Sequence, residues 1–112
     1  MARKRNIKTS PEHWPYHDIG TVEELTKRRR MQMLVHSCLY YELNENIISD
    51  ETYDKWATEL AELLPKSTYT DRFDSYFKDW DGSTGMHLPL RDPWVYSRAS
   101  TLLEQRKKME KA

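Results

Sequence analysis

Apolar residues recur at intervals of three and four along most of the chain after residue 21, which is the pattern of amphipathic helices. The first such segment begins at a capping box, because Thr21 precedes it and Glu24 follows three residues later. We predict a helix over residues 22–43. Its apolar stripe consists of Leu25, Met31, Leu34, Val35, Cys38 and Leu39.

A second helical segment follows a short polar break at residues 44–46. Ser49 is a suitable N-cap, and the two acidic residues after it suit the positive end of a helix dipole. The helical period continues to Pro65, which cannot extend a helix. The sequence therefore predicts a helical hairpin, with helices at residues 22–43 and 50–64.

Two further helices are expected in the second half of the chain. Thr70 can cap a helix over residues 71–80, whose apolar side is aromatic. Gly and Ser residues then indicate a turn-rich loop, and Pro93 suits the first position of a helix over residues 93–108. The predicted fold class is therefore all-α.

The first 20 residues form a different kind of segment. They contain two prolines, a basic cluster and no periodic apolar face, so we expect an extended basic arm. A single helical domain over residues 21–112 should follow it. Trp14, Tyr16 and Ile19 are expected to pack the second half of the arm against this domain. The basic cluster consists of Arg3, Lys4, Arg5 and Lys8.

The composition limits the cellular compartment and the kinds of binding site that we expect for this protein. Cys38 is the only cysteine, which excludes an internal disulfide and favours a reducing compartment. No apolar run approaches the roughly 20 residues that span a bilayer, and no apolar signal segment follows the basic start. The four histidines are dispersed, and no Cys/His spacing resembles a zinc site. We therefore expect a cytoplasmic protein with no metal and no membrane contact.

Charge is balanced overall but unevenly distributed along the chain. Residues 1–30 carry eight basic and four acidic groups, residues 31–74 carry three and nine, and residues 75–112 carry seven and five. The basic ends could contact nucleic acid and the acidic middle a cationic partner, while ordinary solvated helix faces would give the same pattern. The basic run at residues 27–30 spreads around a helix axis, which favours solvated positions over a phosphate site.

The most specific local pattern spans the turn of the hairpin. Tyr40 and Tyr41 end the first predicted helix, and Asp50, Tyr53 and Asp54 begin the second. Spacings of three and four residues place Tyr53 and Asp54 on helical positions next to Asp50. A short connection can therefore bring tyrosine rings and two carboxylates to one rim. Alternatively, the tyrosines only cover the core, and Asp50 is only a charge at a helix start.

Residues 39–63, LYYELNENIISDETYDKWATELAEL, resemble the amino-terminal helical domain of NAD-dependent bacterial DNA ligases, and the resemblance covers residues 35–64. In that family two tyrosines sandwich the nicotinamide ring of nicotinamide mononucleotide (NMN), and acidic groups hold its amide and ribose. The matching positions are Tyr40, Tyr41, Asp50, Tyr53 and Asp54, although the second paired aromatic is often His in the family. An electron-poor pyridinium suits phenol faces, with about 0.5 to 2 kcal/mol from each contact.

The rest of the ligase machinery is not recognisable in the sequence. A ligase needs an adenylated lysine in a Lys-x-Asp-Gly motif, and residues 78–82, KDWDG, have one residue too many between Lys and Asp. A chain of 112 residues is also too short for the adenylation fold. We therefore expect a protein that is not an enzyme.

Three functions remain open from the sequence. The first is a non-catalytic module that recognises NMN, NAD or a related nucleotide through the Tyr/Asp rim. The second is a protein-interaction or inhibitor module on the same scaffold, because small stand-alone relatives of the ligase domain look like phage accessory or anti-defence proteins that act on a host protein. Its candidate contact surfaces are the acidic middle and an exposed segment from Trp80 to Trp94. The third, less favoured by the zero net charge, is nucleic-acid binding.

Overall fold

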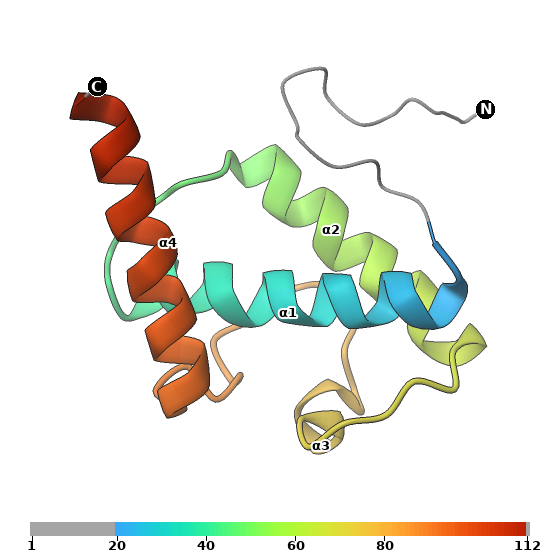
Figure 1. The fold of residues 1–112 in the computed structure, drawn as a ribbon. Helices are drawn as coiled ribbons and strands as arrows, with labels where there is room; N and C mark the ends of the chain where they lie inside the picture. The colour runs from blue at the N-terminus through green and yellow to red at the C-terminus, as the bar shows by residue number, and fades with distance from the viewer. Residues whose placement is uncertain (1–19, 112) are drawn as a thin grey trace.

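Four α-helices make up most of residues 20–111, the part of the chain that the computed structural model describes (Figure 1). They are α1 (Val22–Tyr41), α2 (Asp50–Leu63), α3 (Asp74–Phe77) and α4 (Pro93–Lys111), with a 3₁₀ turn η1 (Leu64–Lys66) after α2. This range contains no strand, so the all-α class predicted from the periodicity is confirmed. Residues 1–19 of the expected arm, and with them the expected contacts of Trp14, Tyr16 and Ile19, lie outside the described residues.

Local sequence signals set three of the helix starts. The Thr21 hydroxyl accepts a hydrogen bond from the Glu24 amide, and the Glu24 carboxylate accepts one from the Thr21 amide, which confirms the capping box of α1. Ser49 caps α2 by accepting from the amide of Thr52 at 3.1 Å. Asp92 precedes α4, and its carboxylate accepts from two amides of the first turn.

The expected helix over residues 71–80 is wrong in its extent. Only a single turn, α3, is helical there, and Thr70 does not cap it: its hydroxyl donates to the carboxylate of Asp74. The Asp71 carboxylate accepts from the Phe73 amide at 2.8 Å, and the Asp74 carboxylate accepts from the Asp71 amide at 2.9 Å. Such side-chain bonds offer the backbone an alternative to helical hydrogen bonds, and the helix is correspondingly short.

The other helix bounds differ less from the prediction. Helix α1 ends at Tyr41, two residues before its predicted end at residue 43, and the chain turns at Asn44 with a φ of 56°. Helix α4 runs to Lys111, three residues past the predicted end at residue 108. Helix α2 ends one residue early, and η1 continues it as a tighter turn. No helix within residues 20–111 is both long and apolar enough to cross a membrane.

The core forms where α1 packs against both α2 and α4, which lie on different sides of it (Figure 1). Cys38 is fully buried in this core, as its place on the apolar stripe predicted, and burial raises the pKa of its thiol. The segment between α2 and α4 supplies a second set of buried side chains that close the core. The core residues are Met33, Leu34, Cys38, Leu39, Trp56, Ala57, Leu60, Phe73, Phe77, Trp80, Leu88, Leu90, Val95 and Ala99.

Trp80 fixes the segment that follows α3 onto the hairpin. Its indole Nε1 donates a 2.9 Å hydrogen bond to the backbone carbonyl of Ala57 in α2, and its side chain is buried. The expectation that Trp80 is exposed is therefore wrong, although most residues at 81–87 are exposed as expected. Next to it, Gly82 adopts a φ of +85°, and a Cβ on Gly82 would lie 3.1 Å from the same Ala57 carbonyl. The backbone approaches α2 closely because this residue has no side chain.

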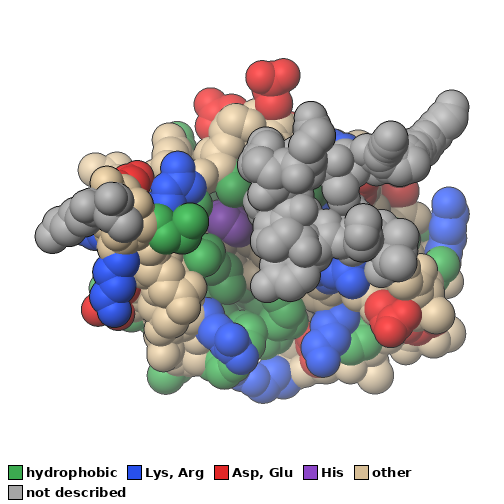
Figure 2. Space-filling model, turned by 45° about the horizontal axis from the view of Figure 1, so that its top comes forward, with side chains coloured by type: hydrophobic (Ala, Val, Ile, Leu, Met, Phe, Trp, Pro, Cys, Tyr) green, Lys and Arg blue, Asp and Glu red, His purple; other side chains and the backbone are tan. Residues whose placement is uncertain are grey.

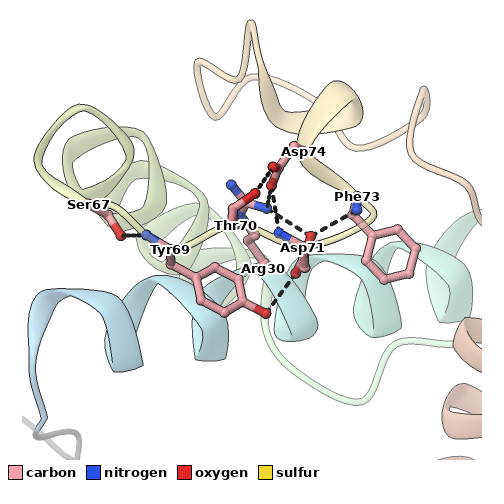
Figure 3. Close-up of polar contacts among 7 residues, drawn as sticks. All are labelled: Arg30, Ser67, Tyr69, Thr70, Asp71, Phe73 and Asp74. Carbon is pink, nitrogen blue, oxygen red and sulfur yellow. Dashed lines mark hydrogen bonds and ion pairs between the residues drawn. The ribbon is translucent and has the colours of Figure 1, made fainter.

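Two arginines of the basic run in α1 are buried, which contradicts the expectation of solvated positions. Arg30 is 5% exposed, and its Nη1 lies 2.9 Å from Asp71 and 2.6 Å from Asp74 (Figure 3). Its guanidinium also lies 5.3 Å from the ring centres of Tyr69 and Phe77. Arg30 thus binds the segment around α3 to α1 through charge and aromatic contacts together.

Arg29 makes the equivalent connection between α1 and α2. Its Nε lies 2.9 Å from the Glu59 carboxylate, and its guanidinium lies 5.6 Å from the ring centre of Trp56. Arg29 is 3% exposed. Consecutive residues on a helix point in directions about 100° apart, so Arg29 and Arg30 can each reach a different packed element.

Candidate tyrosine and aspartate site at the hairpin

The five residues selected from the sequence come from the facing ends of α1 and α2. Tyr40 and Tyr41 are the last two residues of α1, and Asp50, Tyr53 and Asp54 lie in the first two turns of α2. Besides burial, electrostatic effects of Tyr41 and Asp54 raise the pKa of Tyr53, so both residues lie within electrostatic range of its hydroxyl. The structure therefore brings these three together. Asp50 is exposed at the helix start.

Tyr40 and Tyr41 form a corner of exposed aromatic surface. Their ring centres are 4.8 Å apart, and the ring planes meet at 84°. Tyr40 is 49% exposed and Tyr41 is 38% exposed, so both rings present apolar area to solvent. The core aromatics Phe77 and Trp80 are much more deeply buried than these two tyrosines.

Tyr53 is held differently from the other two tyrosines. Its hydroxyl lies 2.8 Å from the hydroxyl of Ser37, which is fully buried on α1. Burial raises the pKa of Tyr53, the hydrogen bond with Ser37 lowers it, and negative charge at Tyr41 and Asp54 raises it. The phenol is therefore protonated at neutral pH, and its hydroxyl already has a partner inside the protein.

Ser37 is a residue of this site that the sequence reasoning missed. It lies one turn before Tyr40 and Tyr41 on α1, next to the apolar Cys38. A small polar residue buried within a packed helix needs a hydrogen-bond partner, and this was the available signal. The partner itself, Tyr53, is 16 residues away and could not be identified from helical spacing alone.

The two carboxylates of the site face solvent. Asp50 and Asp54 are both exposed. Asp54 also borders an open surface hollow of about 560 Å³ on α2, whose lining is mainly acidic. Asp54 therefore lies near Tyr53 and also borders a negatively charged face of α2. The hollow is lined by Glu51, Asp54, Lys55, Thr58, Glu59 and Glu62.

Residues 83–86 adjoin the tyrosines from outside the hairpin. The hydroxyls of Thr84 and Tyr41 lie 3.3 Å apart, and Gly85 is buried beside Ser37 and Tyr53. Neither Thr84 nor Gly85 was a candidate from the sequence. Their segment carries only turn signals, and nothing in its spacing relates it to the tyrosines.

The histidines give no evidence for a metal site in the described part of the chain. No group of three or more His, Cys, Asp or Glu side chains within residues 20–111 is arranged to hold a metal ion. Burial lowers the pKa of His36 to about 4, and its ring centre lies 5.6 Å from that of Trp56. His13 and His17 lie outside the described residues.

Some of the basic residues that were candidates for nucleic-acid binding contact carboxylates within the protein, and others lie outside the described residues. Arg29 and Arg30 are buried against carboxylates, which removes half of the run at residues 27–30 from any phosphate site. On the face shown in Figure 2, Lys and Arg side chains are interspersed with Asp and Glu rather than gathered in one patch. Arg3, Lys4, Arg5 and Lys8 lie outside the described residues.

Comparisons with known proteins return no match: no family model, no curated protein and no solved structure matches this chain. The resemblance to the ligase domain therefore rests on the residues at 35–64 themselves. Evidence on function has to come from the geometry of the site.

Proposed function

We propose that this protein is a non-catalytic helical module that binds NMN, NAD or a related nucleotide through Tyr40, Tyr41, Asp50, Tyr53 and Asp54. The observation that carries the proposal is the pair of exposed, perpendicular rings of Tyr40 and Tyr41 beside Tyr53 and Asp54. Electron-rich phenol faces attract a cationic pyridinium ring. Ionised carboxylates accept hydrogen bonds from amide and ribose hydroxyl groups.

We also propose that the protein has no catalytic activity and that it is located in the cytoplasm. The stretch at residues 78–82 supports a structural role, because Trp80 in its middle is buried and bonded to Ala57. Gly82 is likewise used for close packing against α2. The aromatic rim can bind a ligand by stacking, and we propose no reaction with that ligand.

Calorimetric titration with NMN and with NAD tests the proposal. We expect wild-type protein to bind with a Kd no weaker than the millimolar range, which corresponds to about 4 kcal/mol. Tyr40→Ala and Asp54→Asn should each weaken binding about fivefold or more, since both side chains are exposed and their loss leaves the core intact. No heat at millimolar ligand would reject the proposal.

Matched control variants separate site effects from general surface effects. Tyr76→Ala removes a tyrosine of similar exposure, 40%, from α3. Asp79→Asn removes an exposed carboxylate outside the hairpin. Both controls should bind NMN within about twofold of wild type, because an isolated exposed side chain contributes little elsewhere.

A second candidate function is a protein-interaction or inhibitor module. The observation in its favour is the set of large apolar side chains left exposed, among which tyrosines predominate. Exposed tyrosines are common interface anchors. A partner captured stoichiometrically by wild type and by Asp54→Asn, but not by Tyr40→Ala, would favour this function over nucleotide binding. The exposed set is Tyr40, Tyr41, Tyr76, Met86, Tyr96 and Met109.

A further inference from the structure

Residues 81–88, here called the strap, connect α3 to the segment before α4 and pass close to the Tyr/Asp site. Both ends of the strap are attached to the core. Trp80 precedes it and bonds to Ala57, while Leu88 ends it as a buried side chain that is 4% exposed. The Leu88 amide donates to the carbonyl of Gly85 at 3.1 Å, which closes the strap into a turn. These attachments give the strap a fixed position against the hairpin.

Gly85 is the point at which the strap meets the site. A Cβ on this residue would lie 2.2 Å from Oγ of Ser37 and 2.5 Å from the hydroxyl of Tyr53. Both distances are far inside van der Waals contact, so only glycine fits without displacing the hydroxyl pair. Ser37 is fully buried, and its side chain therefore has no free space into which it could retreat.

Thr84 provides a second contact, this time with Tyr41. Its Oγ1 lies 3.3 Å from the Tyr41 hydroxyl and also accepts a 3.2 Å hydrogen bond from the Met86 amide. Adjacent residues of the strap thus touch two of the three tyrosines of the site. Tyr40 contacts the ring of Tyr41.

We infer that the strap is a positioning element of the ligand site, in which Gly85 keeps the Tyr53 hydroxyl turned inward against Ser37. This inference rests on the proposed function. Tyr53 then offers its ring to the ligand and forms no hydrogen bond with it. A ring fixed before binding loses little conformational freedom when the ligand arrives, which favours affinity. The ligand accepted by such a site is a flat, electron-poor ring recognised by stacking.

The inference is tested by adding and then removing steric conflict at Gly85. Gly85→Ala should weaken NMN binding about tenfold, since its methyl group displaces the Tyr53 ring. The double variant Ser37→Ala with Tyr53→Phe removes both hydroxyls together and leaves neither unpaired, so it is the reference in which a methyl group at Gly85 meets no hydroxyl. Adding Gly85→Ala to this double variant should change its NMN affinity by no more than about threefold, because the space is now free.

A strap control and an optical readout complete the design. Ser83→Ala changes an exposed strap residue that bonds only to Asp81, and it should leave NMN affinity unchanged. Ultraviolet absorbance titration, taken as the difference between wild type and Tyr53→Phe, reports the pKa of Tyr53. This pKa should be above 10 in wild type and closer to 10 in Gly85→Ala.

Each outcome decides one of the two ideas. If wild type binds NMN, the strap inference is overturned by an unaffected Gly85→Ala variant, or by a Gly85→Ala substitution that weakens binding as much in the double variant as it does in wild type. If wild type gives no heat with NMN, the proposed function is rejected and the ligand role of the strap with it. The absorbance titration still shows, in that case, whether Gly85 holds Tyr53 in place.

Discussion

Nη1 of Arg30 in α1 lies 2.6 Å from a carboxylate oxygen of Asp74, the first residue of α3. This contact explains how a helix of one turn keeps a defined place. Hydrogen bonds from the Thr70 hydroxyl and the Asp71 amide, followed by that of Arg30, lower the pKa of Asp74 to about 2. A short helix has little stability of its own, so its position depends on such tertiary contacts.

Arg30→Ala should therefore destabilise the protein by about 2 to 4 kcal/mol, because it leaves Asp71 and Asp74 without their buried cation and opens space beneath Tyr69 and Phe77. Urea unfolding monitored by circular dichroism measures the loss. Arg91→Ala is the matched control, since Arg91 is 85% exposed in its ion pair with Glu42 and should contribute little to stability. Equal effects of the two substitutions would contradict this account.

The partly buried His36 should make stability fall as the pH decreases from about 6.5 to about 4. Burial lowers the pKa of His36 from 6.5 to about 4 in the folded state, so the unfolded chain binds a proton first and is favoured within that window. The full effect is up to about 3 kcal/mol, reached below pH 4. Unfolding free energies at pH 7 and pH 4.5 should differ less in His36→Gln than in wild type. Parallel pH profiles for the two proteins would show that His36 does not titrate this way.

Asp92 should contribute stability that is lost only in strong acid. Its carboxylate pairs with both terminal nitrogens of Arg72, at 2.6 and 3.0 Å, and these hydrogen bonds are the main cause that lowers its pKa from 3.8 to about 2. The contribution is complete above pH 3.8 and disappears as the pH falls through 2. Asp92→Asn, which can still cap α4, should reduce stability by about 1 kcal/mol at pH 7. Thermal melts of wild type and variant should converge near pH 2, and a difference that persists there would argue against charge as the cause.

Loss of the cap at Ser49 should reach the Tyr/Asp site through α2. Ser49→Ala leaves the Thr52 amide without its 3.1 Å hydrogen bond and should cost about 1 kcal/mol of stability. Asp50, Tyr53 and Asp54 lie in the turns next to this cap, so amide hydrogen exchange should speed up there before it does in α4. Ser49→Asp restores an acceptor and should return exchange to the wild-type rate. Uniform acceleration across the chain would instead indicate a general loss of stability.

The parts of the structure that the sequence predicted well depend on neighbouring residues. The capping box at Thr21, the cap at Ser49 and the start of α4 at Pro93 all involve contacts within a few residues. The extent of α3 was predicted wrongly, although the contacts that shorten this helix also involve neighbouring residues. Asp71 and Asp74 were read as helical residues, whereas their side chains bond to nearby amides and to Arg30.

Only those residues of the candidate site that flank the turn of the hairpin could be predicted from the sequence. Residues 39–54 bring Tyr41, Tyr53 and Asp54 together because two capped helices meet at a short connection. The partners of these residues were not predictable. Ser37 is a polar residue inside an apolar stripe, and Gly85 lies more than 30 positions beyond Tyr53 in a segment with turn signals only.

The sequence by itself determined the helical class, three helix starts and the hairpin, because hydrogen bonds and periodicity within a few residues decide them. Tertiary structure alone decided that Arg29 and Arg30 are buried, that Trp80 is inside and that Gly85 rests on Tyr53. Each of these depends on a contact between residues more than 20 positions apart. A charged or polar side chain is buried at low cost only when it meets a hydrogen-bonding or oppositely charged partner. In this protein those partners are distant in the sequence, so the neighbouring residues do not reveal them.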